Sequence, residues 1–140
     1  MFDVNILAVL IAAVVAFIIG FLMHGPVAGK LWMRLANIHP TGNEKLSDMY
    51  GKMFSNLVVN IITAYALAVV WNLMMSSSYT MLNSALCNGI YSALLVWIGF
   101  LATSSYIEVV WMGRSCKLWM FEAFSSGIVM VAMGIVISLW

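Results

Sequence analysis

Four long apolar runs, separated by short polar or charged segments, dominate the pattern of the chain. The runs cover residues 4–23, 53–75, 81–106 and 118–140. The first three contain no Asp, Glu, Lys or Arg, and the fourth contains one such residue, Glu122, near its start. A helix needs about 20 apolar residues to cross the hydrocarbon of a bilayer. Each run therefore predicts a membrane-spanning helix.

A shorter amphipathic pattern follows the first run, at residues 27–38. Leu31 and Leu35 fall on one face of a helix, and Lys30 and Arg34 lie nearby at a spacing of one turn. A helix with this arrangement lies along a membrane surface, with its apolar face toward the lipid. We therefore expect a short interfacial helix between the first two spans.

Composition supports the same fold class, because 64% of residues are hydrophobic and only 8% are charged. Soluble domains average about 25% charged residues. We expect an all-α fold: an integral membrane four-helix bundle that forms a single domain over residues 1–140. The lipid bilayer is its expected surrounding.

The basic residues have an uneven distribution that predicts an orientation. All six Lys and Arg residues lie within residues 30–52 and 114–117. In four antiparallel spans, these two segments share one side of the membrane, and the termini share the other. Basic loops are retained on the cytoplasmic side. The sequence predicts a multi-pass protein of the inner (plasma) membrane with both termini outside.

Small residues recur in two of the spans at spacings that place them on one helix face. Such stripes let two helix backbones approach closely, which favours association within lipid. The contact can be with another span of the same chain or with another subunit. The positions are Ala8, Ala12, Ala16, Gly20, Gly127 and Gly134.

Polar residues form a stripe in each of the two middle spans. Asn56, Asn60 and Thr63 share one face early in the second span, and Asn88 and Ser92 share a face early in the third. An unpaired amide in hydrocarbon costs several kcal/mol, so these groups must face protein or water. Two interpretations are open: hydrogen bonds between helices, or a polar pathway through the bundle.

Two acidic residues flank the second basic segment. Glu108 precedes it and Glu122 follows it, so Arg114 and Lys117 can pair with either carboxylate. Acids within or near membrane spans are candidates for function. We consider both a structural ion pair and a site for a proton or cation.

Other chemistries lack support in the sequence. His24 and His39 do not fit a bis-histidine haem, no metal-ligand spacing links the His, Cys and acidic residues, and the 12 methionines are scattered. No nucleophile motif or Gly-rich phosphate loop is present, and the loops are too short for a separate active site. We expect a non-enzymatic protein with no catalytic, metal or cofactor site and no nucleic-acid partner.

Several local motifs carry a resemblance to a known family. The motifs cover the first span, the segment after it and the closing stretch; they are Val4-Asn5-Ile6-Leu7-Ala8-Val9-Leu10, Gly25-Pro26, Gly29-Lys30, Trp32-Met33, Trp97-Ile98-Gly99-Phe100, Gly113-Arg114, Lys117-Leu118 and Met133-Gly134. With them the chain resembles the bacterial and archaeal membrane family called domain of unknown function 1761. The resemblance implies a four-span integral membrane protein and supplies no activity or cofactor.

These patterns favour a protein that acts through helix–helix association, as a homo-oligomer or as an accessory subunit of a membrane complex. The alternative is a small oligomeric channel or transporter for an ion or small solute. The surroundings of Asn56, Asn60 and Asn88 discriminate between the two. Amides that point into a water-filled path favour transport, whereas amides satisfied between helices favour assembly.

Single-cysteine labelling tests the predicted orientation. In a background that lacks Cys87 and Cys116, a membrane-impermeant thiol reagent applied to intact cells should label Ser77→Cys but not Ser47→Cys. The reason is that basic segments remain cytoplasmic. Labelling at position 47 but not at 77 would show the opposite topology.

Overall fold

The computed structural model describes residues 4–39, 46–76 and 84–140, and the elements in these segments are all helical. Four helical stretches are long and apolar enough to cross a membrane. The third stretch is continuous but contains a π-helical segment, η1. The elements are α1 (Ile6–His24), α2 (Gly29–Leu35), α3 (Leu46–Ser76), α4 (Ala85–Val96), η1 (Trp97–Ala102), α5 (Thr103–Met112) and α6 (Cys116–Ser138).

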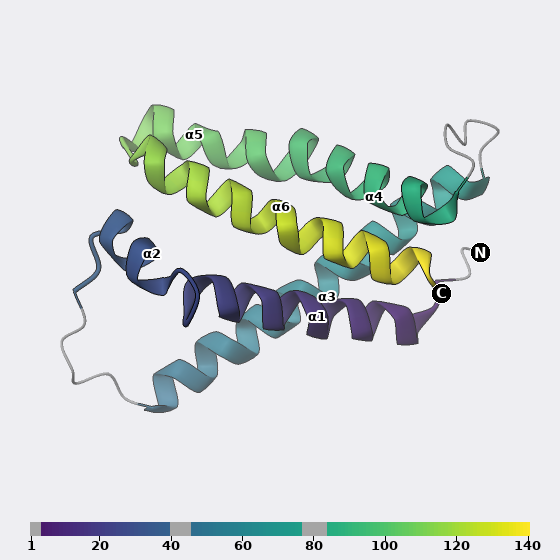
Figure 1. Ribbon diagram of the computed structural model, residues 1–140, viewed down its shortest axis with the longest axis horizontal. Helices are drawn as coiled ribbons and strands as arrows, with labels where there is room; N and C mark the ends of the chain where they lie inside the picture. The colour runs from purple at the N-terminus through teal and green to yellow at the C-terminus, as the bar shows by residue number, and fades with distance from the viewer. Residues whose placement is uncertain (1–3, 40–45, 77–83) are drawn as a thin grey trace.

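The long helices form an antiparallel bundle (Figure 1). Helix α1 packs between α3 and α6, and α4 packs against the same two helices from the other side. Helix α6 contacts every other described element, so it is the central helix of the bundle. The start of α1 and the end of α6 lie at one end, and α2 and the α5–α6 turn lie at the other (Figure 1). The all-helical bundle predicted from the apolar runs is confirmed.

Local side chains explain where two of the helices begin and end. The Asn5 side chain caps α1, because its Oδ1 accepts hydrogen bonds from the amides of Leu7 at 3.0 Å and Ala8 at 3.3 Å. Gly113 ends α5 in the left-handed conformation with φ of 66°. Glycine adopts this conformation without a steric penalty, which reverses the chain sharply toward α6.

Three elements differ in length from the sequence prediction. Helix α3 begins at Leu46 rather than near residue 53, and α5 continues to Met112 rather than ending near 106. The charge-free runs mark apolar surface, whereas helical hydrogen bonding continues past exposed charges such as Lys52. Helix α2 is shorter than the expected 27–38. The start of the third run, residues 81–83, lies outside the described residues.

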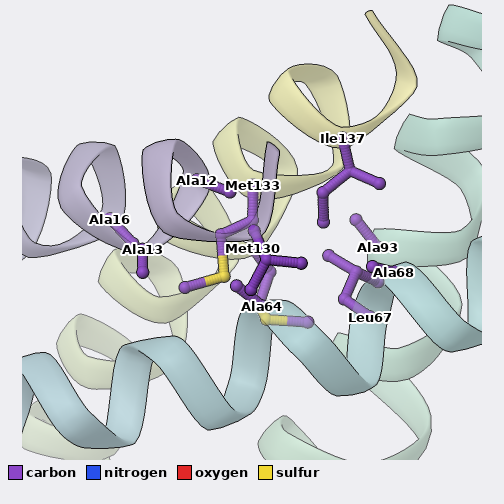
Figure 2. Packing of buried hydrophobic residues seen from close by; sticks show 11 residues of the cluster. Ala12, Ala13, Ala16, Ala64, Leu67, Ala68, Ala93, Met130, Met133 and Ile137 are labelled. Carbon is purple, nitrogen blue, oxygen red and sulfur yellow. The ribbon is translucent and has the colours of Figure 1, made fainter. Parts of the chain in front are cut away.

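The core is built mainly from small residues of α1 and longer side chains of α6. Ala12 and Ala16 are almost fully buried and face the methionines Met130 and Met133, which fill the space between α1 and α3 (Figure 2). Ala64 of α3 closes this layer from the other side (Figure 2). The small residues of α1 therefore serve contacts within this chain.

Glycines mark the closest approach of the third and fourth apolar stretches. A Cβ atom added to Gly134 would lie 2.5 Å from the carbonyl oxygen of Gly89 and 2.8 Å from the Cβ of Ala93. Gly127 lies under the ring of Trp97, whose Cε2 would be 3.0 Å from an added Cβ. Both glycines of α6 are therefore packing positions against α4 and η1.

Gly134→Ala should destabilise the bundle, because the added methyl group would meet backbone that cannot move aside. Overpacking of this kind costs about 1–3 kcal/mol. Gly51→Ala in α3 is the matched control, since its added Cβ meets nothing within 4 Å. The control should be neutral or stabilising, by up to about 1 kcal/mol. Thermal unfolding in one detergent measures both, and equal melting temperatures would contradict the packing role of Gly134.

Candidate functional site

A cavity of about 320 Å³ lies between α1, α3 and α6, with Leu101 of η1 at its edge. Its apolar boundary includes Ala16, Met130 and Met133, which also belong to the core. Polar side chains from all three helices contribute the rest. They are His24, Asn56, Asn60, Thr63, Glu122, Ser125 and Ser126.

The course of α3 explains why space remains here. Helix α3 contacts α4, but within the described segments it contacts neither η1 nor α5. Toward the α2 end of the bundle, the N-terminal half of α3 diverges from α5 and α6 (Figure 1). Gly20 on α1 adds no side chain to fill the gap, and an added Cβ there would meet nothing within 4 Å. The cavity therefore opens where the helices diverge.

The amides of α3 bond to each other along one helix. Asn60 Nδ2 donates to Asn56 Oδ1 at 3.0 Å, and Thr63 Oγ1 donates to the carbonyl of Val59 at 2.9 Å. These bonds are not the interhelical bonds that one interpretation of the sequence expected. A carboxamide offers two N–H donors and two acceptor lone pairs. The pair therefore retains hydrogen-bonding capacity on the face that lines the cavity.

The second polar stripe lies apart from the cavity. Asn88 and Ser92 are buried on α4. Ser92 Oγ donates to the carbonyl of Gly89 at 2.9 Å, and Asn88 Nδ2 contacts Met75 Sδ of α3 at 3.8 Å. This stripe contributes to packing between α3 and α4, and the two stripes do not form one continuous row of polar groups.

An ion-pair cluster joins the cavity to the α5–α6 turn. Arg114 Nη1 pairs with the carboxylate of Glu108 and lies 3.4 Å from Glu122 Oε2. Glu122 lines the cavity, and Glu108 does not. All three side chains are partly exposed, with Glu122 the least exposed at 32%. Of the two basic residues considered from sequence, Arg114 makes both of these ion pairs, and Lys117 makes none within the described part of the chain.

His24 closes the cavity on the α1 side. Its Nδ1 donates to the carbonyl of Gly20 at 3.0 Å, and its ring makes edge contacts with Trp32 and Phe121. Sequence reasoning did not include it among the site residues. The spacing in the sequence could have identified it, because His24 follows Ala16 and Gly20 at the same four-residue interval and extends that stripe to the cavity.

Two serines of α6 were also missed. Ser125 and Ser126 lie one turn beyond Glu122, so the spacing alone places them near the same face. Ser126 is held by neighbours: Trp97 Nε1 donates to its Oγ at 3.1 Å, and the Oγ donates to the carbonyl of Ala123 at 2.9 Å. The hydroxyl is thus fixed from the η1 side while it lines the cavity.

The donor set limits the chemistry of the site. The cavity offers one carboxylate, one imidazole, two carboxamides and three hydroxyl groups. Within the described residues, no group of three or more His, Cys, Asp or Glu side chains is placed to hold a metal ion. The arrangement suits hydrogen bonding to a small polar molecule and attraction of positive charge.

Comparison with known proteins gives a family and no activity. No curated protein and no solved structure shows significant similarity to the chain. A family model described as "Protein of unknown function (DUF1761)" matches residues 7–138, which is almost the whole chain. The chain belongs to this family, as its motifs indicated.

Proposed function

We propose that this is a non-enzymatic multi-pass membrane protein that binds a small polar solute in the cavity between α1, α3 and α6 and carries it across the membrane. One observation supports this most directly: polar side chains of three otherwise apolar helices converge on a single space of about 320 Å³. Polar groups at membrane depth need water or protein partners. A hydrated cavity supplies those partners, and small-molecule sites begin at about this volume.

The shape of the core favours a carrier over an open pore. Met130 and Met133 bound the cavity and are almost fully buried against α1 and α3. A continuous aqueous path would have to displace them. The cavity lies toward the α2 end, the end that the basic segments predict to be cytoplasmic. We therefore propose that the solute binds from the cytoplasmic side in this conformation.

Association remains a second candidate, and the exposure of α3 favours it. In the most apolar stretch of α3, only 17% of the residues are buried, compared with 33% in the corresponding stretch of α6. A second copy or a larger membrane complex could cover this face and the exposed Asn56. The small-residue stripes, which first suggested association, now support it less, because Ala12, Ala16 and Gly134 pack inside the chain.

Asn60→Leu should abolish solute flux while leaving the fold intact. It removes the amide from the cavity wall and should cost roughly 1 kcal/mol of stability. Proteoliposomes carrying the unmodified chain or the variant would be tested with ammonium, alkali cations, small alcohols and amino acids. We expect saturable flux of at least one solute from the unmodified chain only.

Asn72→Leu is the matched control for this experiment. Asn72 lies on the same helix and is partly buried, but its Nδ2 donates to the carbonyl of Ala68 and it does not line the cavity. It should retain flux. Absence of flux from the correctly reconstituted unmodified chain, or equal loss in both variants, would argue against the carrier and leave association as the better proposal.

A further inference from the structure

Glu122 brings a formal charge to the cavity wall. The described lining of the cavity includes no other Asp or Glu and no Lys or Arg. The other polar groups of the cavity wall include hydrogen-bonding oxygen and nitrogen groups: the amides of Asn56 and Asn60, serine hydroxyls and the His24 ring. A carboxylate among hydrogen-bonding groups attracts cations, and an anion would meet repulsion.

Arg114 already places a cationic group beside this carboxylate. Its guanidinium reaches both acids, because Nη1 pairs with the Glu108 carboxylate and lies 3.4 Å from Glu122 Oε2. The two carboxylates carry one more unit of charge than the single guanidinium can neutralise. Arg114 can therefore stay on Glu108 while Glu122 accepts a different cation from the cavity.

We propose that the transported solute is a small monovalent cation with N–H donors, such as ammonium or a primary alkylammonium ion, and that Arg114 competes with it for Glu122. This inference rests on the proposed carrier function and specifies its solute. Binding of the cation replaces the Arg114–Glu122 contact, and the Arg114–Glu108 pair remains. By holding Arg114, the Arg114–Glu108 pair adjusts how strongly Glu122 attracts a cation from the cavity.

The chemistry of the cavity wall explains the choice of this class. A single carboxylate balances one positive charge, whereas divalent ions in proteins are held by several oxygen ligands, commonly including more than one carboxylate. An N–H-bearing cation can donate to the Glu122 carboxylate and to the carboxamide oxygen of Asn60. The cavity of about 320 Å³ admits a short alkyl chain against Met130 and Met133.

Concentration-dependent uptake of radiolabelled methylammonium into proteoliposomes tests the proposal, because substitutions at Glu122, Arg114 and Glu108 should each change uptake in a different way. Glu122→Gln should abolish saturable uptake. Arg114→Gln should lower the half-saturating concentration about two- to fivefold, since it removes the competitor from a partly exposed pair. Glu108→Gln should raise it by a similar factor, because Arg114 then pairs with Glu122 alone.

Lys117→Gln is the charge-matched control, since Lys117 is exposed and does not line the cavity. It should leave half-saturation unchanged, so a change equal to that of Arg114→Gln would indicate a general surface-charge effect and overturn the proposal. Arg114→Lys keeps the positive charge, so it should give the half-saturating concentration of the unmodified chain if Arg114→Gln acts through charge. Melting temperature and size-exclusion profile confirm folding of each variant.

A purely structural role predicts a different pattern, in which all three substitutions within the ion-pair cluster lower uptake together. That result would overturn the competition. Saturable uptake of a neutral solute without methylammonium uptake would overturn the cation assignment and leave the carrier proposal standing. Absence of saturable uptake of every solute tested would overturn both proposals.

Discussion

The structure depends on how closely α6 can approach its neighbours. Helix α6 contacts every other described element, and the contact with α4 is set by two glycines, Gly134 and Gly89. Lipid is as apolar as the side chains it surrounds, so helices gain little from burying apolar area and rely on close packing. A missing Cβ at each of these positions brings the backbones together. This contact fixes the axis around which α1 and α3 pack.

The dependence on close packing between helices also accounts for the cavity, which lies toward the α2 end of the bundle. Along α1 the stripe changes from Ala12 and Ala16, which are buried against α6, to Gly20 and then His24. Neither Gly20, which has no side chain, nor His24, which is held by its own helix, draws α3 inward. Helix α3 therefore leaves the bundle in its N-terminal half (Figure 1). The polar face of α3 then borders a space instead of a neighbouring helix.

The sequence was sufficient to predict the helices but only part of the site. Charge-free runs predicted the four apolar stretches, and four-residue spacing placed Asn56 and Asn60 on one face. The sequence could not show that this face would line the same cavity as Glu122, because the path of α3 determines which helix faces lie opposite each other. Element ends were also missed where a helix continues past a charge, as at Lys52. Periodicity records which residues share a face, and it contains no information on where two helices diverge.

The α5–α6 turn links the ion-pair cluster to the cavity. Gly113 adopts the left-handed conformation, and the next residue, Arg114, turns back so that its side chain reaches Glu108 on α5 and Glu122 on α6. A residue with a Cβ at position 113 would resist this conformation and would displace the guanidinium from one of its partners. The position of the Arg114 guanidinium beside Glu122 is therefore set by the backbone of a turn outside the cavity. A rearrangement of this turn would move the guanidinium and so alter the electrostatic potential around Glu122.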